Sequence, residues 1–254
     1  ESALRLAALA LYITAIEPNG SPRPPQALKF PGDLRGEVLY HFGVEKIRKT
    51  HTAFSLGSLG PKVSSDFDGN FDIVIGNPPW TRLRESKDDE NENSENSSET
   101  DELNEGFTAI GSRVLERRGV QLLASVYQNP DKNPELPFLW RSTEWAKRDG
   151  VIALAMHPRL FMRVRGKGST AWIAINRSIQ VTGILNGSNL RKTNGWQGMD
   201  AAFCALLARN CLPEPDHHLQ FSTPSFDPDA NGFGRFRIYS EMAQSLCDRL
   251  RSRQ

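Results

Sequence analysis

The sequence has few cysteines and no long apolar run. Its three cysteines, Cys204, Cys211 and Cys247, are an odd number without the spacing of a metal site. They predict a reducing compartment, the cytoplasm, with neither a disulfide framework nor a bound metal. No apolar run approaches the roughly 20 residues of a transmembrane helix, so we expect no membrane association. The chain also lacks a signal peptide and begins at Glu1 inside a helical pattern, as a piece of a longer protein would.

The net charge is only +1, but the charges are unevenly distributed. Nine acidic residues and no Lys or Arg lie between positions 88 and 105, so the remainder of the chain is basic. A basic remainder permits binding to phosphate-rich nucleic acid. Residues 86–106 are predicted to be a disordered acidic insertion, because they contain almost no side chain that could join a core. This segment is either a surface insertion or a mimic of phosphate charge that occupies a basic cleft until DNA displaces it.

The most informative stretch runs from Phe71 to Trp80, with the sequence FDIVIGNPPW. Its short apolar run predicts a buried parallel strand that ends at Gly76. Pro78 fixes its own φ and biases Asn77 away from the helical region, so a rigid extended loop should follow. Such a loop brings together the Asn77 amide, the Pro78 backbone carbonyl and the indole of Trp80. Two acceptor oxygens and an aromatic face suit a planar base with an exocyclic amine.

The loop Asn77-Pro78-Pro79-Trp80 resembles the N-P-P-[YFW] catalytic motif of the amino-methyltransferases. The resemblance is strongest to the adenine-N6 DNA methyltransferases of restriction-modification systems, which use S-adenosylmethionine. It implies methyl transfer to N6 of an adenine flipped out of duplex DNA, with all four loop residues catalytic. Trp80 and Trp196 would stack on the base, and no strong general base would be needed. The alternative is a chance N-P-P turn after a strand.

The same resemblance implies an α/β fold over residues 1–210, the C-terminal part of the methyltransferase catalytic domain. This fold would be part of a class I, Rossmann-like sheet with a terminal antiparallel strand. Strands are expected at residues 73–75, 151–156, 181–185 and 201–207, and helices at 2–16, 107–124 and 135–147. The last two strands should pair antiparallel, because the segment between them is too short for a crossover helix. Residues 211–254 should form a linker, with one possible strand at residues 219–222, and a helix leading toward a missing target-recognition domain.

The cofactor half resembles the family less closely. The family's D-P-x-x-G-x-G loop has no counterpart here, and its first two strands are expected to lie upstream of Glu1. The stretch from Leu56 to Leu59 resembles the family's G-D-S-L stretch, with Gly57 where an Asp contacts the cofactor's adenine. Gly57 and Ser58 are therefore the candidate S-adenosylmethionine-binding residues. We expect the 254-residue chain to be inactive by itself.

Basic side chains close to these motifs are candidate DNA contacts, although solvated basic loops are an equally good interpretation. They are Arg82, Arg84, Arg159, Arg163, Arg165, Lys167, Arg191 and Lys192. The expected partners are double-stranded DNA and a fused or associated nuclease and target-recognition domain. Two other functions fit the sequence: a non-catalytic DNA-binding or regulatory remnant, and N-P-P-type methylation of protein glutamine or RNA guanine.

Overall fold

The computed structural model describes residues 6–8, 10–11, 34, 36–48, 51–60, 63–80, 95–162, 166–190, 201–226 and 236–238. The chain forms two compact units, Glu1–Phe67 and Asp68–Gln254. None of the helices in these described ranges is long and apolar enough to cross a membrane.

The first unit contains a two-stranded antiparallel sheet of β1 (Phe42–Arg48) and β2 (His51–Leu56). A short 3-10 helix, η2 (Gly57–Leu59), follows β2 directly. Of the helix predicted over residues 2–16, the described positions 6–8 and 10–11 are helical.

The second unit is built on a five-stranded sheet with the order β3-β4-β6-β5-β7. Its strands are β3 (Phe71–Gly76), β4 (Ala146–Met156), β5 (Gln180–Asn186), β6 (Cys204–Arg209) and β7 (Gln220–Ser222). Strand β3 is parallel to β4 and β5 is parallel to β7, whereas β6 is antiparallel to both β4 and β5. The predicted α/β fold, the parallel β3 and the antiparallel β5–β6 pair are confirmed. The reversed strand lies between β4 and β5, however, and not at the end of the sheet.

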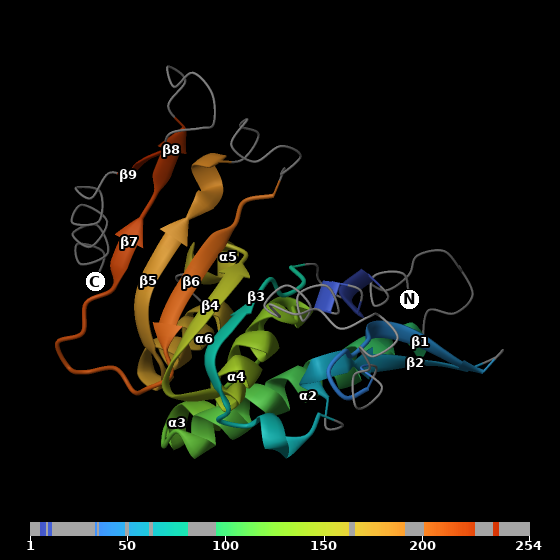
Figure 1. The fold of residues 1–254 in the computed structure, drawn as a ribbon. Coiled ribbons are helices and arrows are strands. Elements are labelled where there is room, and N and C mark those ends of the chain that lie inside the picture. Colours follow the sequence, from blue (N-terminus) through green and yellow to red (C-terminus); the bar gives the residue numbers. More distant parts are fainter. Residues whose placement is uncertain are drawn as a thin grey trace. The chain divides into compact units, whose positions relative to one another are not determined.

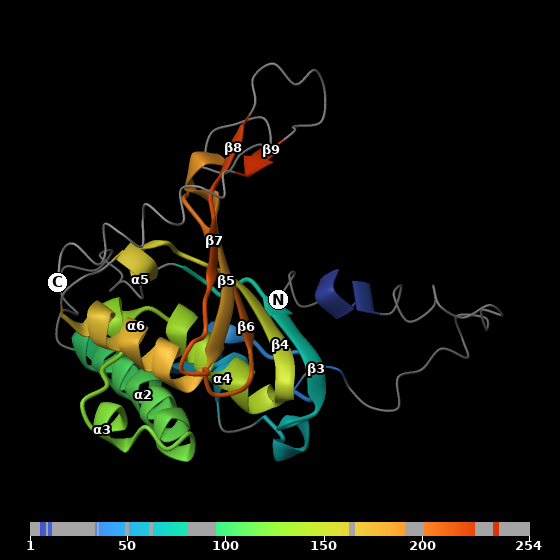
Figure 2. The same ribbon diagram turned by 90° about the vertical axis from the view of Figure 1, so that its left-hand side faces the viewer.

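The helices α2, α4 and α6 lie on one face of this sheet (Figures 1 and 2). The helices of the unit are α2 (Glu95–Arg117), α3 (Gln121–Ala124), α4 (Glu135–Trp145), α5 (Arg159–Met162) and α6 (Lys167–Ser178). The second unit also contains the short 3-10 helices η4 (Pro130–Lys132) and η5 (Gly187–Leu190), while η3 (Ser65–Phe67) ends the first unit. Two further strands, β8 (Pro224–Phe226) and β9 (Phe236–Ile238), pair with each other.

The core lies between the sheet and these helices. Alternate residues of β4 and β6 point inward, as the two-residue period of a strand requires: Ile152, Leu154, Met156, Cys204, Leu206 and Ala208. The helices cover them with buried side chains that include Phe107, Leu115, Leu136, Leu139, Trp140 and Ile175.

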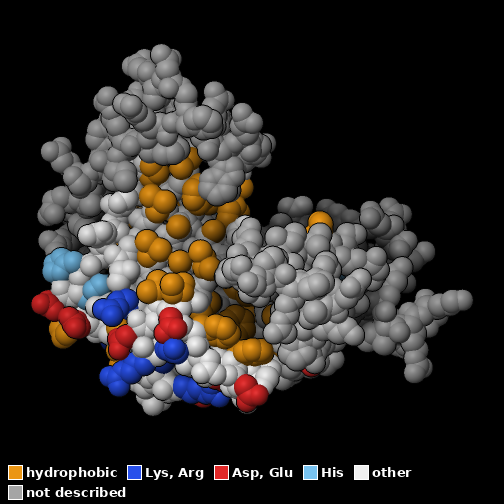
Figure 3. All heavy atoms as spheres, viewed as in Figure 1, with side chains coloured by type: hydrophobic (Ala, Val, Ile, Leu, Met, Phe, Trp, Pro, Cys, Tyr) orange, Lys and Arg blue, Asp and Glu red, His pale blue; other side chains and the backbone are white. Residues whose placement is uncertain are grey.

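The opposite face of the sheet is apolar and exposed, as the band of hydrophobic side chains over the strands in Figure 3 shows. Ile73 is 62% exposed and Ile75 is 81% exposed, so the prediction that this strand is buried is wrong. The reason is the face on which these side chains lie: Ile73 pairs with Val151, which is also exposed, on the side of the sheet away from the buried residues of β4. An apolar run specifies a strand without specifying what covers it.

The predicted disorder of residues 86–106 is wrong for its second half, since α2 begins at Glu95. The downstream part of this helix is anchored in the core by Phe107, Val114 and Leu115, and a formed helix extends at little cost. Residues 86–94 lie outside the described part of the chain.

The segment 211–254 is predicted as a linker with one possible strand at residues 219–222 and a helix, and β7 confirms the strand. It contributes β7 to the main sheet and contains β8 and β9, so part of it is structured. The helix predicted near its end lies outside the described residues.

Candidate active site

The candidate site lies where the parallel strands β3 and β4 end side by side. Gly76, the last residue of β3, pairs with Leu154 of β4. The loop Asn77–Trp80 then leaves β3, with Asn77 exposed, Pro78 buried and Trp80 half-buried. The buried proline anchors the loop while the amide of Asn77 stays accessible. The ends of parallel strands are also where ligands of open α/β sheets bind.

Two contacts with the end of β4 fix the indole of Trp80. Its Nε1–H donates a hydrogen bond of 2.9 Å to the backbone carbonyl of Ala155. The indole also meets the ring of His157 edge-on, with ring centroids 6.4 Å apart and an interplanar angle of 83°. A fixed aromatic ring that remains half-exposed is suited to stack on another planar ring.

His157 directly follows Met156, the last residue of β4. Its Nδ1 accepts hydrogen bonds from the backbone N–H and the Nε–H of Arg159, at 3.1 and 3.2 Å. Burial, and then the neighbouring charge of Arg159, lowers the pKa of His157. The imidazole is therefore neutral at neutral pH, and its Nδ1 is already occupied as an acceptor.

The start of helix α4 contacts both the loop and the end of β4. The Nδ2–H of Asn133 donates to the carbonyl of Trp80 at 3.4 Å, and its Oδ1 accepts the backbone N–H of Glu135 at 3.0 Å. The Oε2 of Glu135 accepts the backbone N–H of His157 at 3.3 Å. Glu135 and Asn133 also line a pocket together with Asp131 and Arg159.

Burial raises the pKa of Glu135 to about 7, because the hydrogen bond from His157 and the charge of Arg159 offset only part of the desolvation. The residue is 4% exposed. Neither Asn133 nor Glu135 stands out in the sequence. The only signal is Asn133-Pro134-Glu135, a helix start with Asn as a capping residue, placed directly before the predicted helix 135–147.

Two of the eight candidate DNA-binding cations are described. Arg159 opens α5, is half-buried and bonds to His157, so its guanidinium has an intramolecular partner. Lys167 is exposed at the start of α6. The remaining candidates lie outside the described residues, as does the predicted base-stacking Trp196: Arg82, Arg84, Arg163, Arg165, Arg191 and Lys192. The DNA contacts therefore remain a prediction.

The candidate cofactor residues Gly57 and Ser58 lie in the first unit, at the start of η2. Gly57 has φ +54°, and a Cβ built on it would lie 2.9 Å from the carbonyl oxygen of His41. Only glycine fits this turn without strain, so an Asp could not take the place of Gly57 on the same backbone. Cofactor binding by these two residues remains a prediction.

The chain was compared with curated proteins, solved structures and family profiles. No curated protein matches the sequence. Among solved structures, the methyltransferase subunit of a type I restriction-modification system from Streptococcus thermophilus is 14% identical, with a TM-score of 0.38, over 73% of this chain and 33% of that one. A protein from Listeria monocytogenes assigned as a class I S-adenosylmethionine-dependent methyltransferase is 12% identical, with a TM-score of 0.35, over 60% of this chain and 36% of that one.

The type IIG restriction endonuclease BpuSI is 10% identical, with a TM-score of 0.43, over 72% of this chain and 20% of that one. The chain thus spans between 20% and 36% of the length of these three proteins. The sequence profile of the Eco57I restriction-modification methylases matches residues 3–189, and the chain belongs to that family.

Proposed function

We propose that this protein is a DNA methyltransferase that transfers a methyl group to N6 of an adenine flipped out of duplex DNA. The observation that carries the proposal is the loop after β3, in which an exposed Asn77 adjoins a buried Pro78 and a fixed, half-exposed Trp80. Membership of a restriction-modification methylase family supports the reaction class. The choice of adenine comes from the match of Asn77–Trp80 to the N-P-P-aromatic motif.

The chemistry of the base side follows from the loop. The side-chain oxygen of Asn77 and the backbone carbonyl of Pro78 accept the two hydrogens of the adenine amine, which turns the nitrogen lone pair toward the methyl donor. The nitrogen becomes positively charged during transfer, and the same two oxygens stabilise that charge. Trp80 stacks on the ring and holds it in place.

The cofactor side is less complete among the described residues. S-adenosylmethionine would supply the methyl group as an electrophile. Gly57 has no side chain to bind it, and the 2.9 Å spacing to His41 leaves no room for one. Ser58 can still offer a hydroxyl. Because the 254 residues also contain no D-P-x-x-G-x-G loop, we propose that they do not methylate DNA by themselves.

The test is methyl transfer by the full-length gene product to duplex DNA, followed by digestion and mass spectrometry of the nucleosides. N6-methyladenine should form, and Asn77→Ala should lower the rate at least about 100-fold, as removal of one charge-stabilising group does. Asn189→Ala, at an exposed position of η5, is the matched control and should keep the wild-type rate. Formation of N4-methylcytosine, or full activity of Asn77→Ala, would refute the proposal.

A second candidate function is a DNA-binding or regulatory protein that has lost catalysis. The observation that favours it is the backbone of Gly57, which excludes the acidic side chain expected for cofactor binding. Calorimetry of the full-length product with S-adenosylmethionine, with and without an adenine-containing duplex, separates the two. Binding of DNA without binding of cofactor would favour this candidate. The methyl-transfer assay repeated on RNA and on glutamine-containing protein tests the remaining N-P-P substrates.

A further inference from the structure

Two residues at the start of α4 contact the two segments that build the candidate site. Asn133 reaches the loop after β3 through the carbonyl of Trp80, at 3.4 Å. Glu135 reaches the end of β4 through the backbone N–H of His157, at 3.3 Å. The rings of Trp80 and His157 meet between these two bonds. One helix start therefore braces both sides of the aromatic contact.

These contacts go beyond what capping the helix requires. The Oδ1 of Asn133 accepts the backbone N–H of Glu135, and its Nδ2 donates to the Trp80 carbonyl. The Asn133 side chain also hydrogen-bonds the Glu135 carboxyl group. Asn133 is also held by a third hydrogen bond, because its backbone carbonyl accepts the Nδ2–H of buried Asn129 at 2.9 Å. The amide of Asn133 is thus a fixed bridge between η4, α4 and the loop.

The carboxyl group of Glu135 is buried without a paired cation in the part of the chain that the structure describes. It is 4% exposed, and among the described residues no Lys or Arg nitrogen lies within 4.0 Å of it. Burying a carboxylate without a paired cation disfavours folding. Stability therefore does not account for a glutamate at this position.

We propose that Asn133 and Glu135 are positioning residues that hold Trp80 and His157 in the arrangement that presents the indole to the target base. The role of this arrangement in catalysis rests on the proposed function. An ionised carboxylate accepts the His157 N–H more strongly than a protonated one does. The order of Trp80 therefore depends on the protonation of Glu135 and declines as the pH falls.

The charged and titratable groups around Glu135 come from four elements. Arg159 of α5 favours its ionised form, and Asp131 of η4 opposes it. Cys204 of β6 also senses the carboxylate, since burial and then the charge of Glu135 raise the pKa of that thiol. His157, directly after β4, donates its backbone N–H to the carboxylate. Burial has a larger effect on the pKa of Glu135 than these charges, so the carboxyl group gains or loses its proton near neutral pH.

The test is the pH titration of the Trp80 indole N–H resonance by nitrogen-proton NMR of the full chain, without DNA or cofactor. The resonance is assigned by its loss in Trp80→Phe. In the wild type it should shift with a midpoint near pH 7, and in Glu135→Gln the shift should be absent. Glu116→Gln, an exposed glutamate of α2, is the matched control and should titrate like the wild type. Asn133→Ala should displace the resonance at every pH.

The outcomes that would overturn the proposal are specific. A Trp80 shift that persists in Glu135→Gln would assign the titration to His157 instead. An unshifted resonance in Asn133→Ala would remove Asn133 from the role. Circular dichroism of each variant establishes that it is folded, and Glu135→Gln is close to isosteric.

A second readout connects the positioning role to catalysis. The rate of methyl transfer by the full-length product should fall about tenfold from pH 8 to pH 6, as one ionisation near pH 7 predicts. In Glu135→Gln this decrease in rate should be absent. The NMR titration tests the positioning role, and the activity of Asn77→Ala tests the proposed function. An NMR titration as expected with full activity of Asn77→Ala would leave the positioning role standing while refuting the proposed function.

Discussion

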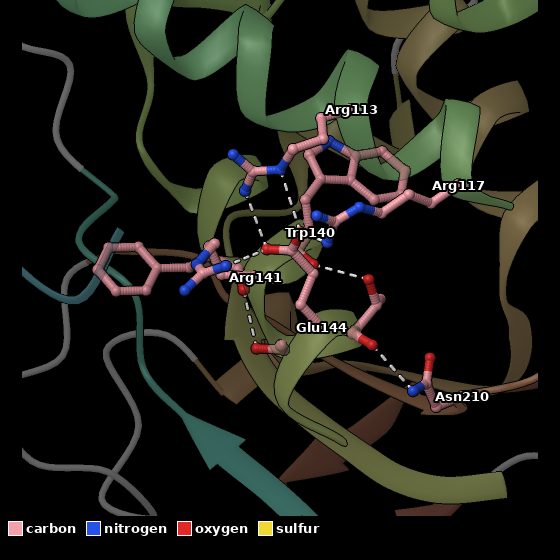
Figure 4. Close-up of polar contacts among 9 residues, drawn as sticks. Arg113, Arg117, Trp140, Arg141, Glu144 and Asn210 are labelled. Atoms are coloured by element: carbon pink, nitrogen blue, oxygen red, sulfur yellow. Dashed lines mark hydrogen bonds and ion pairs between the residues drawn. The ribbon is translucent and has the colours of Figure 1, made fainter. Parts of the chain in front are cut away.

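Helix α4 carries a buried glutamate at each end, and the two have opposite surroundings. Glu144, in the last turn, has a side chain that is 5% exposed and bonds to three arginines (Figure 4). Arg113 donates to it at 3.0 and 3.1 Å, Arg117 at 2.8 Å, and Arg141 donates as well. Glu135, in the first turn, accepts the backbone N–H of His157 at 3.3 Å and a side-chain hydrogen bond from Asn133, but no arginine donates to it among the described residues.

The surroundings reverse the acidity of the two groups. Burial alone would raise the pKa of Glu144, but hydrogen bonds from Arg113 and Arg141, together with their charges, outweigh it and the pKa is lowered. Burial raises the pKa of Glu135 to about 7. The helix dipole would predict the reverse order, since it favours an anion at the first turn. Its contribution of about 0.3–1 kcal/mol is too small to decide the outcome.

The two ends of α4 therefore differ in how firmly they are held. At its C-terminal end α4 is fixed to its neighbours, where the Nδ2–H of Asn210 also donates to the carbonyls of Thr143 and Ala146 at 2.9 and 2.7 Å. At its N-terminal end the contacts are longer and include a group that titrates near neutral pH. Two glutamates whose side chains are both largely shielded from solvent therefore differ in acidity, because arginines surround Glu144 and, among the described residues, do not surround Glu135.

The largest expected effect is the loss of the arginine cluster. Glu144→Gln keeps the shape of the side chain but leaves the buried Arg141 without its anion, so the free energy of unfolding should fall by roughly 3 kcal/mol at pH 7. Urea unfolding followed by circular dichroism measures it. Glu116→Gln, the exposed control on α2, should change it by less than about 0.5 kcal/mol. If both variants are equally stable, the contrast between the two ends of α4 is not energetic.

The next effect is the pH dependence due to Glu135. Its folded-state pKa lies above the ordinary value of 4.5, so the protonated form favours folding and this stability is lost as the pH rises through about 7. Between pH 5 and pH 8 the contribution should decline by about 2 kcal/mol. Glu135→Gln should remove this decline and unfold at a higher urea concentration than the wild type at pH 8.

Glu144 provides the contrast within the same titration. Its lowered pKa places its stabilising contribution above the ordinary value of 4.5, to be lost only as the pH falls below that range. Glu144→Gln should therefore leave the slope between pH 5 and pH 8 unchanged. A wild-type curve that is flat over this interval would contradict the position of Glu135 as a titrating group.

Part of this organisation is readable from the sequence. The apolar runs predict β3 and the second half of β4, and the prolines predict the loop whose Pro78 is buried and Asn77 exposed. These features are local, because strand formation and proline geometry depend on neighbouring residues. The antiparallel pairing of β5 and β6 follows from the length of the segment between them.

The two ends of α4 are not readable in this way. Glu135 and Glu144 look like members of a solvated helix face, since charged residues are rarely buried. The partner of Glu144 on α2, Arg113, is 31 residues away, and no periodicity connects them. The exposure of Ile75 and the early start of α2 at Glu95 likewise depend on what packs where, which only the assembled fold decides.

The smallest effect discriminates among the three arginines. The side chain of Arg141 is 9% exposed, whereas that of Arg117 is 61% exposed although its distance to Glu144 is only 2.8 Å. Solvent screens the exposed pair, so Arg117→Met should lower the free energy of unfolding by less than about 0.5 kcal/mol. Arg141→Met should lower it by roughly 1.5 kcal/mol, because a hydrogen bond to a buried charge is lost. If both variants lost the same free energy of unfolding in urea, burial of the cation would not set the strength of the cluster. The difference between Glu144 and Glu135 would then lie in the number of hydrogen-bond donors alone.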